Sequence, residues 1–177
     1  LELINQSDGQ ILCNIAKGKA AYIDAAVIYS KNAFDGEWGH KSAADRGRIL
    51  SKLGRLVMEN IDFLATLEAL DVGKPLKQAR ADAIALARYM EFYGGAADKV
   101  HGDTIPYQDG YTVYTLREAH GVTGHIVPWN YPMQIIGRSI GAALAMGNAC
   151  VLKPAEEAGL TALAFADLGI EAGLPKG

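Results

Sequence analysis

The sequence predicts an α/β fold, in which a helix-rich first half precedes the start of a parallel sheet. Three observations predict it. Apolar residues recur at helical spacing through most of residues 20–98. After residue 120 the pattern becomes strand, helix, strand, helix, which is typical of parallel strands joined by helices. The run Ala149–Leu152 is short and apolar, as expected of a parallel strand buried on both faces.

The first half begins with a predicted hairpin. Two short apolar runs, Leu3–Ile4 and Ile11–Ile15, lie on either side of Asp8-Gly9, and an Asp-Gly pair favours a hairpin turn. The change to helical spacing then predicts four helices, with approximate bounds 22–34, 42–60, 61–72 and 77–98.

Local signals support the ends of these helices. Ser42 is a suitable N-cap for the second helix, because a serine side chain can accept from a free backbone amide. Gly73, with Pro75 just beyond it, ends the third helix. We expect Gly94-Gly95 to bend or shorten the fourth, since glycine weakens a helix interior.

The second half carries the predicted parallel strands. Aromatic and β-branched residues alternate over 111–116 and predict a strand, and a second follows at 121–127. Pro132 suits the first turn of a helix that ends near Gly147-Asn148, and a last helix is expected at 160–172. The chain ends where the next parallel strand is expected, so we interpret it as truncated.

Composition narrows the class of protein. The chain has 177 residues, enough for one compact domain, and its net charge of −3 argues against a nucleic-acid partner. Its apolar stretches are too short to cross a membrane. It opens without Met and without a signal-peptide pattern, so we expect missing upstream residues and a cytoplasmic location. Cys13 and Cys150 have no metal-ligand spacing, and we expect two buried structural thiols and no metal.

The first segment whose residues could take part in binding or catalysis is 124–132, where a strand is expected to end and a helix to begin. Ligands of open α/β sheets bind just outside such strand ends. Asn130 lies there, and its amide N–H could stabilise a developing oxyanion. A plainer interpretation is that Asn130 caps the following helix, and spacing alone favours that cap.

The second segment is 150–156, another expected junction of strand and helix. A carboxylate at Glu156 could accept hydrogen bonds from both hydroxyls of a ribose, with Lys153 beside it. A solvated lysine and a first-turn glutamate favoured by the helix dipole explain the same residues equally well.

Taken together, these motifs resemble the aldehyde dehydrogenase superfamily. The resemblance covers the whole chain and depends on the joint order of several motifs, each weak by itself. They are Leu67-Glu68 through Asp71, Gly73-Lys74-Pro75, His101-Gly102 with Ile105-Pro106, Pro128-Trp129-Asn130, Gly147-Asn148, Lys153-Pro154-Ala155-Glu156 and Glu171–Pro175.

The resemblance implies the N-terminal part of a Rossmann-like, NAD(P)-dependent cofactor-binding domain. Residues 1–110 would form its hairpin and helical part, 111–121 a hairpin segment for oligomerisation, and 122–177 the first βαβα part of the sheet. Asn130 would be the catalytic oxyanion donor. The implied cofactor-binding residues are Ile126, Val127, Pro128, Trp129, Lys153, Ala155 and Glu156. Glu156 would favour NAD over NADP, because its charge repels a 2′-phosphate, although NADP stays possible.

The same resemblance implies an aldehyde substrate and a homo-oligomer, a dimer or tetramer, in a complete enzyme. The family's catalytic cysteine and general base would lie beyond residue 177, so this chain alone is expected to be inactive. Two alternatives stay open at this point. One is a short, non-catalytic assembly or binding module derived from the fold, and the other is an unrelated α/β domain with chance motifs. Charges around 80–82 and 98–99 are expected on solvated helix faces.

Overall fold

The computed structural model describes residues 1–177 and has six helices and six short strands. In chain order they are β1 (Glu2–Ile4), β2 (Ile11–Asn14), α1 (Ala20–Asp35), α2 (Ala43–Glu59), α3 (Ile61–Val72), α4 (Leu76–Ala96), β3 (Thr104–Ile105), β4 (Val113–Tyr114), β5 (Val122–Ile126), α5 (Pro132–Ala145), β6 (Ala149–Lys153) and α6 (Leu160–Ala172).

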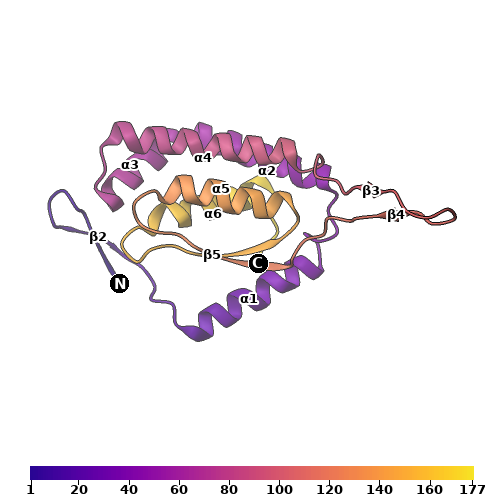
Figure 1. The fold of residues 1–177 in the computed structure, drawn as a ribbon. Helices are drawn as coiled ribbons and strands as arrows, with labels where there is room; N and C mark the ends of the chain where they lie inside the picture. The colour runs from indigo at the N-terminus through magenta and orange to yellow at the C-terminus, as the bar shows by residue number, and fades with distance from the viewer.

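The elements stack in layers around one parallel strand pair (Figure 1). β5 and β6 run parallel, joined by α5, with register partners from Val122 and Ala149 to Ile126 and Lys153. α1 contacts the pair on one side, and α5 contacts it on the other. The helices α2, α3 and α4 form an outer layer over α5 and α6. The predicted α/β class and the βαβα order of the second half are therefore confirmed.

One hydrophobic core joins the helical first half to the strand pair. Leu50, Leu53 and Leu64 from α2 and α3 belong to the same buried cluster as Met133 and Ile136 from α5. α2 also contacts α6, so the core extends from the outer helices to the last helix of the chain. Burial of these side chains from water is the main source of stability for such a fold.

Two helices pack closely at a pair of glycines. A Cβ on Gly47 of α2 would lie 2.5 Å from the Gly94 carbonyl oxygen of α4, too close for any other residue to fit unchanged. α4 ends at Ala96, directly after Gly94-Gly95 and two residues short of the predicted 98. Gly94 also allows two helix backbones to touch.

The helix ends follow the sequence signals closely. The Ser42 hydroxyl accepts from the Asp45 amide at 3.1 Å, which confirms the predicted cap of α2. Gly73 ends α3 in the left-handed region, with a φ of 76°. Asp71, in the last turn of α3, accepts from the Leu160 amide at 2.9 Å. A buried carboxylate thus faces the N-terminus of α6, where the helix dipole favours negative charge.

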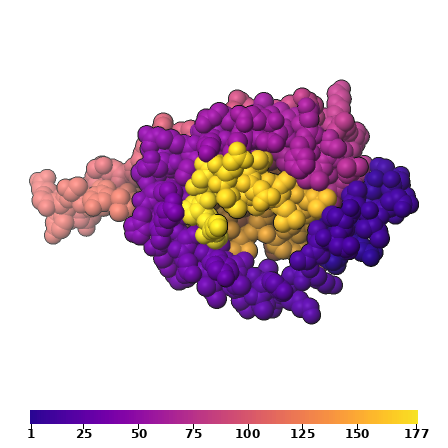
Figure 2. Space-filling view, turned by 180° about the vertical axis from the view of Figure 1, so that it is seen from behind, coloured from indigo at the N-terminus to yellow at the C-terminus, as the bar shows by residue number.

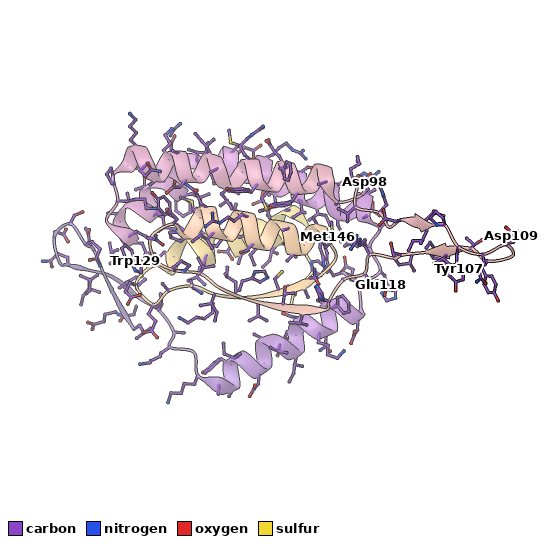
Figure 3. The ribbon with its side chains drawn as sticks, viewed as in Figure 1. Asp98, Tyr107, Asp109, Glu118, Trp129 and Met146 are labelled. Atoms are coloured by element: carbon purple, nitrogen blue, oxygen red, sulfur yellow. The ribbon has the colours of Figure 1, made fainter.

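An extended arm projects from the domain between α4 and β5. It contains β3 and β4, paired only through Thr104 with Tyr114 and Ile105 with Val113. Figure 3 places Tyr107 and Asp109 at its tip, and Figure 2 shows the arm standing clear of the body. The strand expected over 111–116 is reduced to Val113–Tyr114, since side chains of the arm have no layer to pack against.

The C-terminal helix borders an apolar cavity of about 360 Å³. The cavity lies between α6, the outer edge of β6 and the end of α1, and most of its lining is hydrophobic. In Figure 2, α6 (yellow) lies in view between the outer helices and α1. No helix is both long and apolar enough to span a lipid bilayer.

Candidate functional site

The two predicted segments meet at the carboxyl ends of β5 and β6. Ile126 and Lys153 are register partners, and the Val127 amide donates to the Lys153 carbonyl at 3.0 Å. This parallel pairing brings residues 126–130 and 153–156 to one edge of the sheet. Ligands of α/β folds bind at this kind of edge.

The side chains at this edge combine exposed apolar and polar groups. Ile126 is 82% exposed and Trp129 is 59% exposed, although both are large and hydrophobic. Lys153 and Glu156 are also exposed and form no ion pair with each other. Apolar surface beside a few hydrogen-bonding groups is the composition of a ligand site. In Figure 3, Trp129 lies at the opposite end of the molecule from the arm.

The predicted cofactor-binding residues do not all line the same cavity. Val127 is 2% exposed and belongs to the hydrophobic core, so only its backbone is available to a ligand. Pro128 is exposed and Ala155 is half-buried. Trp129 lines a cavity of about 260 Å³ with Asp71, whereas Glu156 lines a separate one of about 220 Å³ beside β1.

The helix cap expected at Asn130 is wrong. α5 begins at Pro132, its N-cap position is Tyr131, and no side chain caps it. Asn130 therefore lies one residue too early to accept from the first turn of the helix. Its side chain is exposed and forms no hydrogen bond within the chain. The whole side-chain amide is thus free to meet a ligand.

A buried charge cluster holds the Asn130 backbone in place. The Lys74 ammonium donates to Glu68 Oε1 at 2.7 Å, to Asp82 Oδ2 at 2.8 Å and to the Asn130 carbonyl at 3.1 Å. It also lies 4.8 Å from the centre of the Tyr131 ring, in a cation–π contact. We call Glu68, Lys74 and Asp82 the Lys74 cluster.

The position of Asp82 corrects a second expectation. We expected the charges around 80–82 on a solvated helix face, but the Asp82 side chain is fully buried. Its Oδ1 accepts from Gln78 at 2.9 Å and from Gln134 at 2.7 Å. Gln134 lies in α5, so this carboxylate ties α4 to the helix that follows Asn130. Helical spacing within α4 could not reveal a partner 52 residues away.

The groups of the Lys74 cluster have shifted acidities. Burial raises the pKa of the Glu68 carboxyl, an effect that outweighs the contact with Lys74 and is reinforced by the nearby charge of Asp82. The pKa of Asp82 is lowered: burial acts against the charge, but hydrogen bonds from Lys74, Gln134 and Gln78 outweigh it. The pKa of Lys74 is raised by the two carboxylates, against the effect of burial. Two buried carboxylates thus share one cation.

A second residue outside the predicted set, Asn148, positions the start of both strands. Its side-chain oxygen accepts from the His120 amide at 2.7 Å and from the Gly121 amide at 3.2 Å. Its carbonyl accepts from the buried Trp38 ring nitrogen at 3.0 Å. Helical spacing indicated only the end of a helix at Asn148, because these partners are remote in the chain.

Cys150 has the environment of a structural thiol. It lies on β6, and its sulfur is 3.6 Å from the Thr123 hydroxyl. Burial raises the pKa of the Cys150 thiol to about 11. A thiol with so little thiolate is a poor nucleophile at neutral pH. This agrees with the expected structural role.

We therefore expect iodoacetamide to alkylate Cys150 about 10²-fold more slowly than a free cysteine at pH 8, because reactivity follows the thiolate fraction. Peptide mapping by mass spectrometry at timed intervals measures the rate. Urea should raise it to the free-cysteine value, which serves as the control. Alkylation of the folded protein at the free-cysteine rate would contradict the structural role.

Comparison with known proteins gives a consistent result. The family model described as "Aldehyde dehydrogenase family" matches residues 1–177. Hydroxyisobutyraldehyde dehydrogenase of Mycolicibacterium austroafricanum is 46% identical over 174 residues, which cover 98% of this chain and 34% of the relative. The mitochondrial aldehyde dehydrogenase of Equus caballus is 41% identical over 177 residues, covering 98% of this chain and 35% of the relative. The chain thus spans about a third of the length of these curated relatives.

Solved structures share the same backbone. A protein from Burkholderia cenocepacia, assigned to the aldehyde dehydrogenases, is 63% identical and superposes with a TM-score of 0.98 over 99% of this chain and 37% of that one. PnpE in complex with nicotinamide adenine dinucleotide is 38% identical, with a TM-score of 0.97 over 99% of this chain and 36% of that one. This chain therefore resembles both proteins in sequence as well as in fold.

Proposed function

Because this chain belongs to the aldehyde dehydrogenase family, we propose that it forms the N-terminal part of an enzyme that oxidises an aldehyde to a carboxylic acid with NAD(P). The observation that carries the proposal is the edge where β5 and β6 end. There an unpartnered Asn130 amide lies on one strand exit and Lys153 and Glu156 on the other. The proposal extends to a complete protein about three times as long, like the relatives.

We infer that this edge holds the adenosine half of the dinucleotide. The exposed Ile126 and Trp129 offer apolar surface to a flat ring, and Glu156 and Lys153 offer an acceptor and a donor to ribose hydroxyls. The edge of the site would be completed by the backbone of Val127 and by the surfaces of Pro128 and Ala155. The NAD complex of PnpE, 38% identical to this chain, supports the choice of cofactor. The bound nicotinamide would supply the hydride acceptor.

Asn130 would act on the substrate oxygen. In the proposed reaction a cysteine thiolate adds to the aldehyde carbon, and the carbonyl electron pair moves onto oxygen. The amide N–H of Asn130 would donate to that oxygen as its negative charge grows. Once hydride has passed from the same carbon to the nicotinamide that the site would hold, a thioester would remain, and the amide would donate again when water attacks it. Neither cysteine of this chain suits the role of nucleophile, because Cys150 is a weak acid and Cys13 lies on β2, in the first hairpin. The thiolate would come from outside residues 1–177.

We propose that the arm mediates assembly into a homo-oligomer. Its exposed Tyr107, Tyr111 and Tyr114 give it a large apolar area beyond the body of the domain. Such area commonly marks a protein interface. A non-catalytic assembly module remains the competing idea, and it predicts an oligomer that binds no dinucleotide. The expected cytoplasmic location stays a prediction, since mitochondrial proteins are among the relatives.

Calorimetry of NAD binding to the complete protein tests the proposed site. We expect Glu156→Ala to weaken NAD binding about 10-fold, because it removes two hydrogen bonds to a charged acceptor. The variant should also narrow the difference between NAD and NADP, since the repulsion of the 2′-phosphate is lost. Glu171→Ala, at an exposed glutamate of α6, is the matched control and should bind as wild type. Equal affinities of all three proteins would refute the site.

A further inference from the structure

The Lys74 ammonium lies beside Asn130, at the end of the proposed site where the reaction would take place. An ammonium has three N–H donors. In this structure each finds one acceptor, on Glu68, Asp82 and the Asn130 carbonyl. The two carboxylates are fully buried and sit on α3 and α4, so they fix the ammonium in space. The third donor is directed to the strand exit.

We propose that Lys74 is a positioning residue, which holds the Asn130 peptide so that the side-chain amide stays aimed at the substrate oxygen. This inference rests on the proposed function, because it takes Asn130 as the oxyanion donor. The amide of Asn130 forms no hydrogen bond within the chain, so its direction depends on where its own backbone is held. The backbone carbonyl is held by Lys74.

The neighbouring residues strengthen this hold. Tyr131 places its ring 4.8 Å from the same ammonium, and Gln134 in the first turn of α5 donates to Asp82 at 2.7 Å. The residues on the C-terminal side of Asn130 are therefore tied to the Lys74 cluster as well. A misplacement of about 1 Å at a reacting group can cost about 10²-fold in rate, so such support matters for catalysis.

Stability alone is a weak explanation for these buried charges. Replacing a buried ion cluster by well-packed hydrophobic side chains of similar volume is often neutral or stabilising. Apolar side chains could thus preserve the fold, but they have no N–H or O–H to donate to the Asn130 carbonyl. This difference separates a positioning role from a purely structural one.

The test uses the complete enzyme with two variants of the cluster. Lys74→Met removes the ammonium, and a triple variant with Glu68→Gln, Lys74→Met and Asp82→Asn removes all the charge without leaving a buried carboxylate unpaired. Each should lower kcat about 10- to 100-fold while NAD affinity changes less than about 3-fold. Lys77→Met, at an exposed lysine of α4, is the matched control and should leave kcat unchanged. Melting temperature is followed in parallel, and the triple variant serves if Lys74→Met does not fold.

Combination with Asn130→Ala decides between the two roles. If Lys74 acts through Asn130, the cluster variants should lower kcat no further once Asn130 is alanine. If the two effects multiply, or if the folded triple variant keeps wild-type kcat, the positioning role is refuted. If Asn130→Ala alone keeps wild-type kcat, the proposed function fails, and the inference fails with it.

Discussion

Replacing Asn130 by alanine in the complete enzyme should lower kcat about 10²- to 10³-fold and leave NAD affinity nearly unchanged. The magnitude is that of removing one donor from an oxyanion site. The loss should fall on kcat, because the hydrogen bond strengthens as charge grows on the substrate oxygen. Stability should change little, since the Asn130 side chain is exposed and has no partner in the chain. Steady-state kinetics and calorimetry on the same preparation measure both quantities.

Two further variants sharpen this expectation. Asn130→Asp keeps the shape of the side chain but replaces the donor by an oxygen, so it should be at least as slow as Asn130→Ala. Asn32→Ala, at an exposed position on α1, should keep full activity. An Asn130→Asp enzyme with wild-type kcat would show that the amide donates nothing to the reaction.

Replacing Asp82 by asparagine should lower the free energy of unfolding by about 2–3 kcal/mol, whereas Glu68→Gln should cost less than about 1 kcal/mol or stabilise. Asp82 accepts hydrogen bonds from Lys74, Gln78 and Gln134 as a charged group. Glu68 has Lys74 as its side-chain donor, and burial opposes its charge. Urea unfolding compares the variants, with Asp109→Asn at the exposed arm tip as control.

The pH dependence of the two variants should differ in sign. Asp82 has a lowered folded-state pKa, so its stabilising effect is present above the unfolded pKa and is lost as pH falls through the folded one. Glu68 has a raised folded-state pKa, so its charge destabilises the fold increasingly as pH rises from the unfolded pKa to the folded one. Glu68→Gln should therefore gain stability relative to wild type with rising pH. Equal losses for both substitutions at every pH would contradict this account of the cluster.

Local signals predicted the helices well. The bounds of α3 were predicted as 61–72, because its apolar spacing ends at a glycine that adopts a left-handed conformation. Ser42 was predicted as a cap because this role needs only a partner three residues away. The strand expected at 111–116 is formed only at Val113–Tyr114, for a related reason. Alternating residues there lie on an arm with no neighbouring layer, so their pattern does not reflect burial.

The sequence predicted which segments meet at the candidate site, but it did not predict the buried charges of the Lys74 cluster that hold Asn130. Two parallel strands bring their carboxyl ends to one edge of the sheet, so the placement of residues 126–130 and 153–156 at the same edge followed from topology. The role of Lys74 did not follow, because its contact with the Asn130 carbonyl spans 56 residues. The burial of Asp82 was missed for the same reason, since its partner Gln134 lies on another helix.

The shared hydrophobic core has a consequence for how this stretch of chain can be divided. The arm stands between the two halves in sequence and projects from the surface, so it looks like a natural place to cut. Leu50 and Leu53 before it nevertheless pack in one cluster with Met133 and Ile136 after it. If the chain were divided at the arm, each piece would expose the apolar side chains that it buries against the other piece. Genetic exchange among relatives would accordingly have to carry residues 43–172 as a block.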